Sequence, residues 1–171
     1  MTQPEHGAVL DALPVFDNHH GRPEVWPGLR VDGMVERSMV FTAAELLDLT
    51  RQTIVDDFRC VDGWSAPGQE WEGVPLAVLL DIVKPLPTAR FAAIAAADFQ
   101  VGVALDDPSG ALLATRLNGA DLPEAHGGPC RLVSLGQACY ASVKWVDSIT
   151  LMDAAPEDTA REIAMARNAG G

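Results

Sequence analysis

The chain has 171 residues, of which 48% are hydrophobic, and this is enough for one domain with a buried core. Its formal net charge of −12 argues against nucleic acids and anionic membrane surfaces as partners, because both require clustered lysine and arginine. The charge does not exclude an anionic ligand, since a local pocket can carry a charge opposite to that of the whole protein.

Neither a membrane span nor a signal peptide is visible in the sequence. No apolar stretch is long enough to cross a bilayer, and the first residues lack a basic region followed by an apolar run. We therefore expect a cytoplasmic protein. The cysteines are Cys60, Cys130 and Cys139, and an odd number is not typical of a disulfide-stabilised domain.

Residues 1–27 are rich in proline, glycine and histidine and predict an irregular N-terminal arm. Beyond this arm, alternating or β-branched segments predict a series of strands. These segments are residues 29–33, 38–41, 53–59, 91–96, 112–117, 130–133 and 143–152. The strand over residues 112–117 should end in a turn, because Asn118 and Gly119 follow it.

Helices are predicted between these strands and at the end of the chain. The first should begin at Thr42, because residues 42–45 (TAAE) form a capping box. The second should begin at Pro75, whose missing N–H costs nothing at the start of a helix. Its apolar face would consist of Leu76, Leu79, Leu80 and Val83. With a short terminal helix after Asp153, this mixture predicts an α+β fold and not a doubly wound sheet.

The sequence contains no P-loop, no dinucleotide-binding glycine fingerprint and no nucleophile elbow. A zinc site formed by His126, Cys130 and Cys139 is conceivable, although the spacing is unusual. By itself Cys60 is ambiguous, because an isolated cysteine at the end of a strand is more often part of a core than reactive.

Several segments together resemble the molybdopterin-binding domain of the sulfite oxidase and methionine-sulfoxide reductase type of enzyme. Residues 58–65 (FRCVDGWS) are similar to that family's cysteine motif, and residues 126–133 (HGGPCRLV) to its His-Gly-x-Pro-x-Arg segment. Residues 142–145 (SVKW) resemble its Val-Lys-Trp strand. The segments WEGVPL and LNG, at 71–76 and 117–119, fit the same pattern.

This resemblance covers residues 28–152 and implies a mixed β-sheet fold with short helices. It also implies an oxidoreductase that transfers an oxygen atom or two electrons at a molybdenum–molybdopterin cofactor. Cys60 would be catalytic and would ligate the molybdenum, which a thiolate suits as a soft ligand. Arg131 and Lys144 would contact the cofactor phosphate. The further cofactor contacts would be Asn18, His19, Asp98, His126, Ser142 and Val143.

Asp17 stands where the resemblance places an arginine before the Asn-His pair, and a carboxylate there would repel sulfite. We therefore expect a small-molecule substrate other than sulfite. The sequence shows no haem, flavin or immunoglobulin-like domain, so a separate electron-transfer partner and a monomeric state are expected. We expect residues 1–27 to be the arm, residues 28–152 the molybdopterin-binding domain and residues 153–171 a helical tail.

Each proposed contact has an alternative interpretation. Arg131 could pair with an acid on a neighbouring strand, Lys144 could be an exposed strand lysine, and His126 could be a solvated loop residue. The alternative function is a binding module that keeps the fold without molybdenum or redox activity, because one fold can serve several functions.

Overall fold

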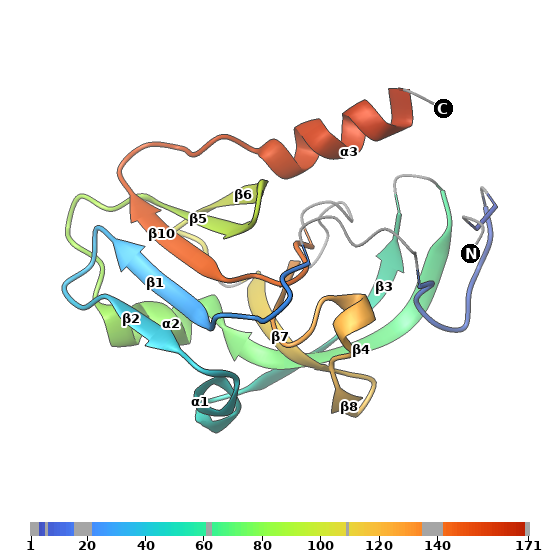
Figure 1. The fold of residues 1–171 in the computed structure, drawn as a ribbon, viewed down its shortest axis with the longest axis horizontal. Coiled ribbons are helices and arrows are strands. Elements are labelled where there is room, and N and C mark those ends of the chain that lie inside the picture. Colours follow the sequence, from blue (N-terminus) through green and yellow to red (C-terminus); the bar gives the residue numbers. More distant parts are fainter. Residues whose placement is uncertain are drawn as a thin grey trace.

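Strands form most of the regular structure of this protein. The structure is a computed structural model and describes residues 4–5, 7–15, 22–60, 63–108, 110–134 and 142–169. The strands are β1 (Leu29–Gly33), β2 (Met39–Phe41), β3 (Gln52–Arg59), β4 (Ser65–Pro75), β5 (Phe91–Ala96), β6 (Phe99–Ala104), β7 (Ala111–Leu117), β8 (Ala120–Asp121), β9 (Arg131–Ser134) and β10 (Ser148–Met152). The helices are α1 (Ala43–Asp48), α2 (Leu76–Val83), α3 (Thr159–Ala169) and the 3₁₀ helix η1 (Glu124–His126) (Figure 1). No helix in the described part of the chain is long and apolar enough to cross a membrane.

The strands form two sheets, one of which is mixed. The first sheet has the order β2-β1-β10-β5-β6, in which β1 runs parallel to β10 and the other neighbours are antiparallel. The second sheet has the order β3-β4-β7-β8, and β9 also pairs with β7. The helices beside these sheets are short, so the predicted α+β class with a mixed β-sheet is confirmed.

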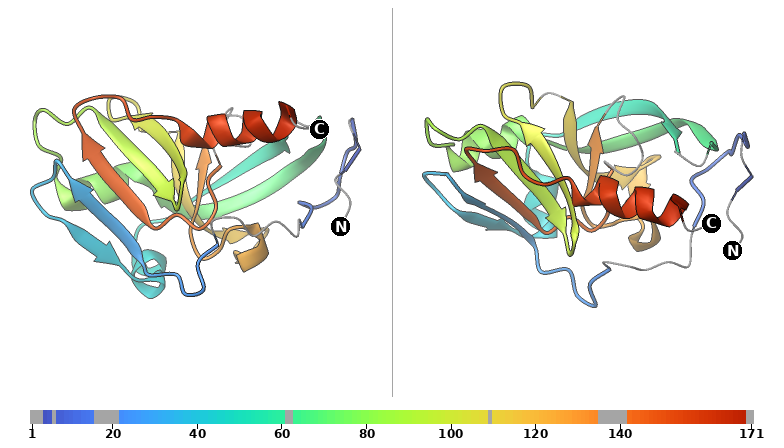
Figure 2. Two further views of the ribbon diagram at one scale, coloured as in Figure 1. Left: turned by 45° about the horizontal axis from the view of Figure 1, so that its top comes forward. Right: turned by 90° about the horizontal axis from the view of Figure 1, so that it is seen from above.

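The main hydrophobic core lies between the two sheets. It joins Val31 of β1 and Ile149 of β10 in the first sheet to Leu113 of β7 in the second. The predicted apolar face of α2 is buried in it, namely Leu76, Leu79, Leu80 and Val83. Figure 2 shows α3 beside β6, and Ala160 of α3 reaches the same core. Removing this apolar surface from water provides the main drive for folding.

The second sheet is buried on its other face as well. Along β7, Leu113 faces the main core, whereas Leu112 and Ala114 face a smaller cluster, here named the second core. This division follows from the strand, whose successive side chains point to opposite faces. The second core consists of Leu13, Trp64, Ala66, Trp71, Leu112, Ala114, Leu117, Leu122 and Val133. Phe58 and Cys60 pack against it.

Part of the N-terminal arm is bound to the end of β4. Val9 forms a parallel bridge with Ser65, and the Leu10 and Ser65 amides each donate a 2.8 Å hydrogen bond across it, to Ser65 O and Ala8 O. Leu13 is buried in the second core. The arm thus covers part of the sheet face against which Cys60 packs.

Several local signals in the sequence are confirmed. The Thr42 hydroxyl accepts from the Glu45 amide at 3.1 Å, and the Glu45 carboxylate accepts from the Thr42 amide at 2.7 Å, as a capping box requires. The second helix forms, but α2 begins at Leu76, one residue later than predicted, with Pro75 as its N-cap. Asn118 and Gly119, with φ of 52° and 81°, form the turn between β7 and β8.

One predicted strand is wrong over its first half. The pattern of residues 143–152 predicted one continuous strand, but β10 begins only at Ser148. Trp145 has a φ of 55°, which lies outside the β region and cannot continue a strand. Val143, Trp145 and Val146 are all buried, so this stretch enters the main core without the alternation of a strand.

Candidate cofactor site

Arg131 is a buried cation held on the second-core face of the second sheet. It lies opposite Ala114 in the β7–β9 pair, and its relative exposure is 4%. Its Nε donates to Ser142 Oγ at 3.0 Å and its Nη1 donates to the His126 carbonyl at 2.8 Å. The Arg131 Cζ lies 5.3 Å from the ring centroid of Phe58 and 5.1 Å from that of Trp71. Two hydrogen bonds and two aromatic rings therefore fix the guanidinium.

The segment that follows β9 returns alongside it and brings Ser142 to Arg131. The Leu132 amide donates to the Val143 carbonyl at 2.9 Å, and the Val146 amide donates to the Cys130 carbonyl at 2.9 Å. The Ser142 hydroxyl also donates to the Leu132 carbonyl at 2.9 Å. The Val143 side chain lies in the main core, so only its backbone could contact a ligand near Arg131.

Lys144 is a second cation in the same place. Its half-buried side chain places Nζ 3.4 Å from the Ala125 carbonyl and 5.7 Å from the centroid of the Trp145 ring. Burial, together with the charge of Arg131, lowers the pKa of Lys144 to about 8. Among the described residues no carboxylate forms an ion pair with Lys144. A buried ammonium in this position would be stabilised by an anion.

The loop after η1 wraps around Lys144. Gly127 has a φ of 103°, and a Cβ atom on it would lie only 2.8 Å from the Lys144 Cγ. The Trp145 amide donates to the Gly127 carbonyl at 3.1 Å, and the Trp145 indole donates to the Glu124 carbonyl at 2.8 Å. Burial first, and then the charges of Lys144 and Arg131, lower the pKa of His126. His126 is therefore neutral at pH 7 and can both donate and accept hydrogen bonds.

Cys60 follows β3 in a tight turn. Its amide donates to the Trp64 carbonyl at 3.0 Å, and the Gly63 amide donates to the Cys60 carbonyl at 3.0 Å. Its side chain is partly buried against the second core, to which the rings around Arg131 also belong or pack. Cys130, in contrast, is completely buried in the main core, where burial raises the pKa of its thiol to about 12. Cys130 therefore stays protonated and is a poor metal ligand.

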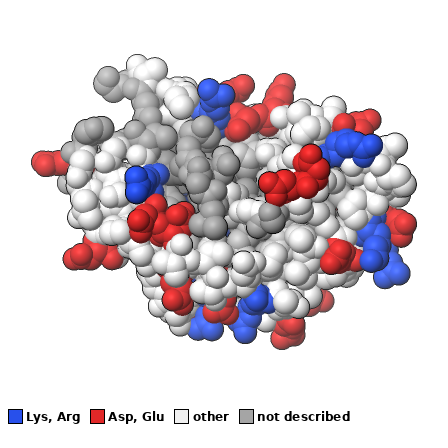
Figure 3. Space-filling model, turned by 180° about the vertical axis from the view of Figure 1, so that it is seen from behind, with Lys and Arg blue, Asp and Glu red and all other residues white. Residues whose placement is uncertain are grey.

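The cationic character of the site is local. Figure 3 shows one face of the molecule, on which most basic side chains lie beside acidic ones and form no continuous basic surface. Arg131 and Lys144 are instead buried or half-buried near one another, with a half-buried thiol on the same sheet face. A ligand that carries both a phosphate and metal-binding sulfur chemistry fits these donors, because the cations suit the phosphate and the thiolate suits a soft metal.

The family model of the oxidoreductase molybdopterin binding domain matches residues 16–160 of this chain. The chain belongs to this family. The family binds a molybdenum–molybdopterin cofactor, so this chain is a molybdopterin-binding oxidoreductase domain, and the resemblance seen in the sequence motifs is confirmed.

Two kinds of relative are similar to this molybdopterin-binding domain. The NADPH nitrate reductase of Aspergillus niger is 34% identical over 159 residues, which are 76% of this chain and 18% of that enzyme. The corresponding enzyme of Beauveria bassiana is 32% identical over 101 residues, which are 52% of this chain and 11% of that enzyme. The crystal structure of the sulfane dehydrogenase SoxCD from Paracoccus pantotrophus superimposes with a TM-score of 0.68 at 27% identity, over 75% of this chain and 38% of that chain. This domain thus spans only a minor part of each relative.

The structure brings some of the predicted cofactor-binding residues together and places others elsewhere. Hydrogen bonds join Arg131 to Ser142 and His126, and Lys144 lies against the same loop. Asp98 is exposed in the turn between β5 and β6, where its carbonyl accepts from the Thr159 hydroxyl. Asn18 and His19 lie outside the described residues. The roles of all these side chains toward the cofactor stay predictions.

The zinc alternative has no support in the described part of the chain. There, no group of three or more His, Cys, Asp or Glu side chains is arranged to hold a metal ion. Cys130 lies in the main core, and Cys139 lies outside the described residues. The interpretation of Lys144 as an exposed strand residue is wrong, since it is half-buried and precedes β10.

Sequence reasoning missed the aromatic side chains that hold Arg131. Phe58 precedes Cys60 by two residues, so a strand places both on one face, and this spacing was the available signal. Nothing in the sequence indicated that Trp71, on the neighbouring strand β4, would face the same guanidinium.

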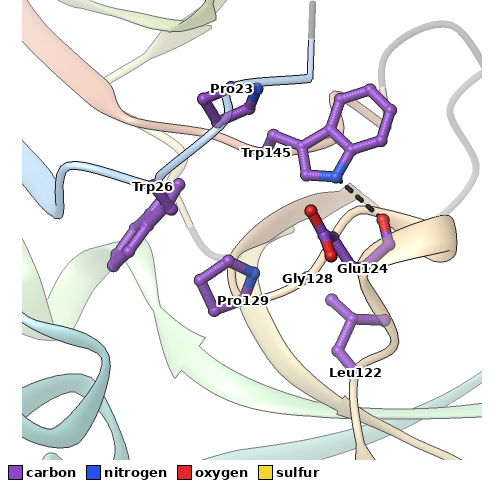
Figure 4. A pocket seen from close by; sticks show the side chains of 7 residues that line it. All are labelled: Pro23, Trp26, Leu122, Glu124, Gly128, Pro129 and Trp145. Atoms are coloured by element: carbon purple, nitrogen blue, oxygen red, sulfur yellow. Dashed lines mark hydrogen bonds between the residues drawn. The ribbon is translucent and has the colours of Figure 1, made fainter. Parts of the chain in front are cut away.

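A pocket of about 320 Å³ lies between η1 with the loop that follows it and the end of the arm (Figure 4). It is lined by Pro23, Trp26, Leu122, Glu124, Gly128, Pro129 and Trp145. The Trp26 indole donates to the Val146 carbonyl at 2.9 Å, and Arg22 Nε lies 2.7 Å from Glu124 Oε1. These contacts fasten residues 22–26 to η1, which carries His126, and to the segment that precedes β10.

Proposed function

We propose that this domain catalyses oxygen-atom or two-electron transfer at a molybdenum ion to which Cys60 is the protein ligand. The observation that carries the proposal is a pair of interacting cations, Arg131 and Lys144, of which Arg131 is buried on the sheet face against which Cys60 packs. The cofactor, when bound, supplies the redox chemistry at its metal, and the protein binds and orients it.

Each side chain then has a separate task. The Cys60 thiolate donates to the soft metal, since a thiolate is the form of cysteine that binds metals. Arg131 presents a planar fork and Lys144 a point charge to the phosphate. Neutral His126 would exchange hydrogen bonds with the cofactor. The Ser142 hydroxyl already bonds Arg131 and the Leu132 carbonyl, so it acts by holding Arg131.

The proposed substrate is a small molecule other than sulfite, because Asp17 precedes Asn18 in the segment that would face the metal. We further propose a monomeric domain that receives or delivers electrons through a separate protein. Within it, residues 28–152 are the domain proper, residues 1–27 the arm and residues 153–171 the helical tail. An assay of the metal-loaded protein with sulfite and an artificial acceptor tests the substrate. A turnover on the order of tens per second would contradict this part of the proposal.

X-ray absorption at the molybdenum edge tests the ligand assignment. The protein is produced in a host that makes the cofactor, and the sulfur ligands of the metal are counted in the wild type and in Cys60→Ser. We expect the variant to have one sulfur ligand fewer. An unchanged number of sulfur ligands in Cys60→Ser would reject Cys60 as the metal ligand. If the wild-type protein never contains pterin, the alternative function, a binding module without redox activity, replaces the proposal.

A further inference from the structure

Phe58 stacks between the buried arginine and the turn that holds Cys60. On one side, its ring centroid lies 5.3 Å from Arg131 Cζ. On the other, its ring stacks on that of Trp64, with centroids 5.8 Å apart and an interplanar angle of 22°. The Trp64 carbonyl in turn accepts the hydrogen bond from the Cys60 amide. An unbroken series of contacts thus runs from Arg131 to the backbone of Cys60.

The contacts between Arg131 and Cys60 matter because β3, which carries Phe58, lies at the edge of its sheet. Within the described residues β3 is an edge strand with β4 as its one partner, and its register shifts between Asp56 and Phe58. The end of an edge strand has hydrogen bonds on one side only, so side-chain packing contributes more to its position. Trp71, the other ring against Arg131, lies on β4 between two neighbouring strands and is completely buried. Phe58 is therefore the more adjustable of the two contacts.

We propose that Phe58 is a positioning residue that couples the anion-binding site at Arg131 to the turn that holds Cys60. A phosphate group at that site restricts the remaining motion of the guanidinium, Phe58 transmits this restraint to Trp64, and the hydrogen bonds of the Cys60 and Gly63 amides open less often. The position of Cys60 is then set by contacts that begin at Arg131. This inference rests on the proposed function for its purpose, but the coupling itself exists in the chain without cofactor.

Hydrogen exchange in the cofactor-free protein tests the coupling, with inorganic pyrophosphate as the probe. Exchange of the Cys60 and Gly63 amides is measured with and without saturating pyrophosphate at pH 7, after its affinity has been determined by calorimetry for each variant. In the wild type we expect pyrophosphate to slow this exchange by about two- to fivefold, the range that one cation–π contact provides. Alkylation of the Cys60 thiol, measured by the mass of the peptide that contains it, should also be slower with pyrophosphate than without it.

The variants separate transmission through the ring from a simple effect of charge. Phe58→Leu keeps an apolar side chain but removes the stacked ring, and the response of both amides should disappear although pyrophosphate still binds. Phe58→Tyr keeps the ring and should restore the response. An equal response in Phe58→Leu, or none in the wild type at saturation, would overturn the inference. Because no molybdenum enters this experiment, its outcome is independent of whether Cys60 ligates the metal.

Discussion

Lys144 lies so close to Gly127 that a Cβ atom on residue 127 would come within 2.8 Å of the Lys144 Cγ and 2.9 Å of its Cβ. Two features therefore favour glycine at position 127. A side chain there would collide with Lys144, and the φ of 103° lies in a region that other residues rarely adopt. The loop can close over the lysine stem only because this position lacks a side chain. The ammonium is thereby held beside the Ala125 carbonyl, at 3.4 Å.

Gly127→Ala should consequently displace Lys144 and lower the cofactor content of the purified protein. We expect a loss of about 1–2 kcal/mol in the free energy of unfolding from backbone strain, with the effect on cofactor added to it. Gly119→Ala is the matched control, because its φ is 81° but a Cβ atom there would meet nothing within 4 Å. If both variants lose stability and only Gly127→Ala loses pterin, the contact with Lys144 is responsible. Equal pterin contents in the two variants would contradict this explanation.

The affinity of the site for anions should decrease as the pH rises through about 8, the value to which burial lowers the pKa of Lys144. An anion stabilises the charged amine, so binding is tightest where Lys144 is already protonated, below this pKa. Above it, binding must also take up a proton, and the affinity falls. Calorimetric titration with sulfate, which does not itself titrate in this range, measures the effect. Lys144→Arg should bind with little dependence on pH between 7 and 9.5, since arginine stays charged, and a wild-type affinity that is constant across this range would refute the prediction.

The two described cysteines should respond differently to serine. Cys60→Ser should abolish redox activity and leave both the pterin content and the thermal unfolding close to those of the wild type, because the phosphate contacts lie elsewhere. Cys130→Ser buries a hydroxyl in the main core and should cost about 1–3 kcal/mol of stability while activity persists. Cys139→Ser should also spare activity. Full activity in Cys60→Ser would show that Cys60 is not required for the redox chemistry and would reject it as the metal ligand.

The sequence predicted those parts of the fold that depend on local chemistry. The capping box of Thr42 and Glu45, the buried face of α2 and the turn at Asn118 each follow from a few neighbouring residues. Strand β4 escaped prediction because Pro67, Gly68 and Gly73 interrupt its pattern, although pairing on both sides holds it in the sheet.

The cationic residues of the site were found because they lie within recognisable motifs. The surroundings of these cationic residues were not predicted, because they are assembled from strands that are distant in the sequence. Phe58 and Trp71 meet Arg131 across four strands of one sheet, and only the register of β3, β4, β7 and β9 brings them together. The lowered pKa of Lys144 likewise depends on its burial and on Arg131, which its position in the chain does not reveal.

Arg131→Lys should weaken cofactor retention although the positive charge is kept. A lysine cannot reproduce the two hydrogen bonds to Ser142 Oγ and the His126 carbonyl, and it would leave these partly buried acceptors without their donor. The loss of a charge-assisted contact costs about 1.5–3 kcal/mol, so we expect at least tenfold weaker retention together with a lower unfolding temperature.

Arg116→Lys is the matched control for this substitution. Arg116 lies on β7 of the same sheet, where its Nη2 donates to the Gly119 carbonyl at 2.7 Å, away from the loop that carries His126. Pterin content and thermal unfolding should be compared for both variants after identical dialysis. We expect Arg116→Lys to retain the cofactor as the wild type does. If Arg131→Lys retains it equally well, charge alone is sufficient, and the fork held by Ser142 and His126 has no part in binding the phosphate.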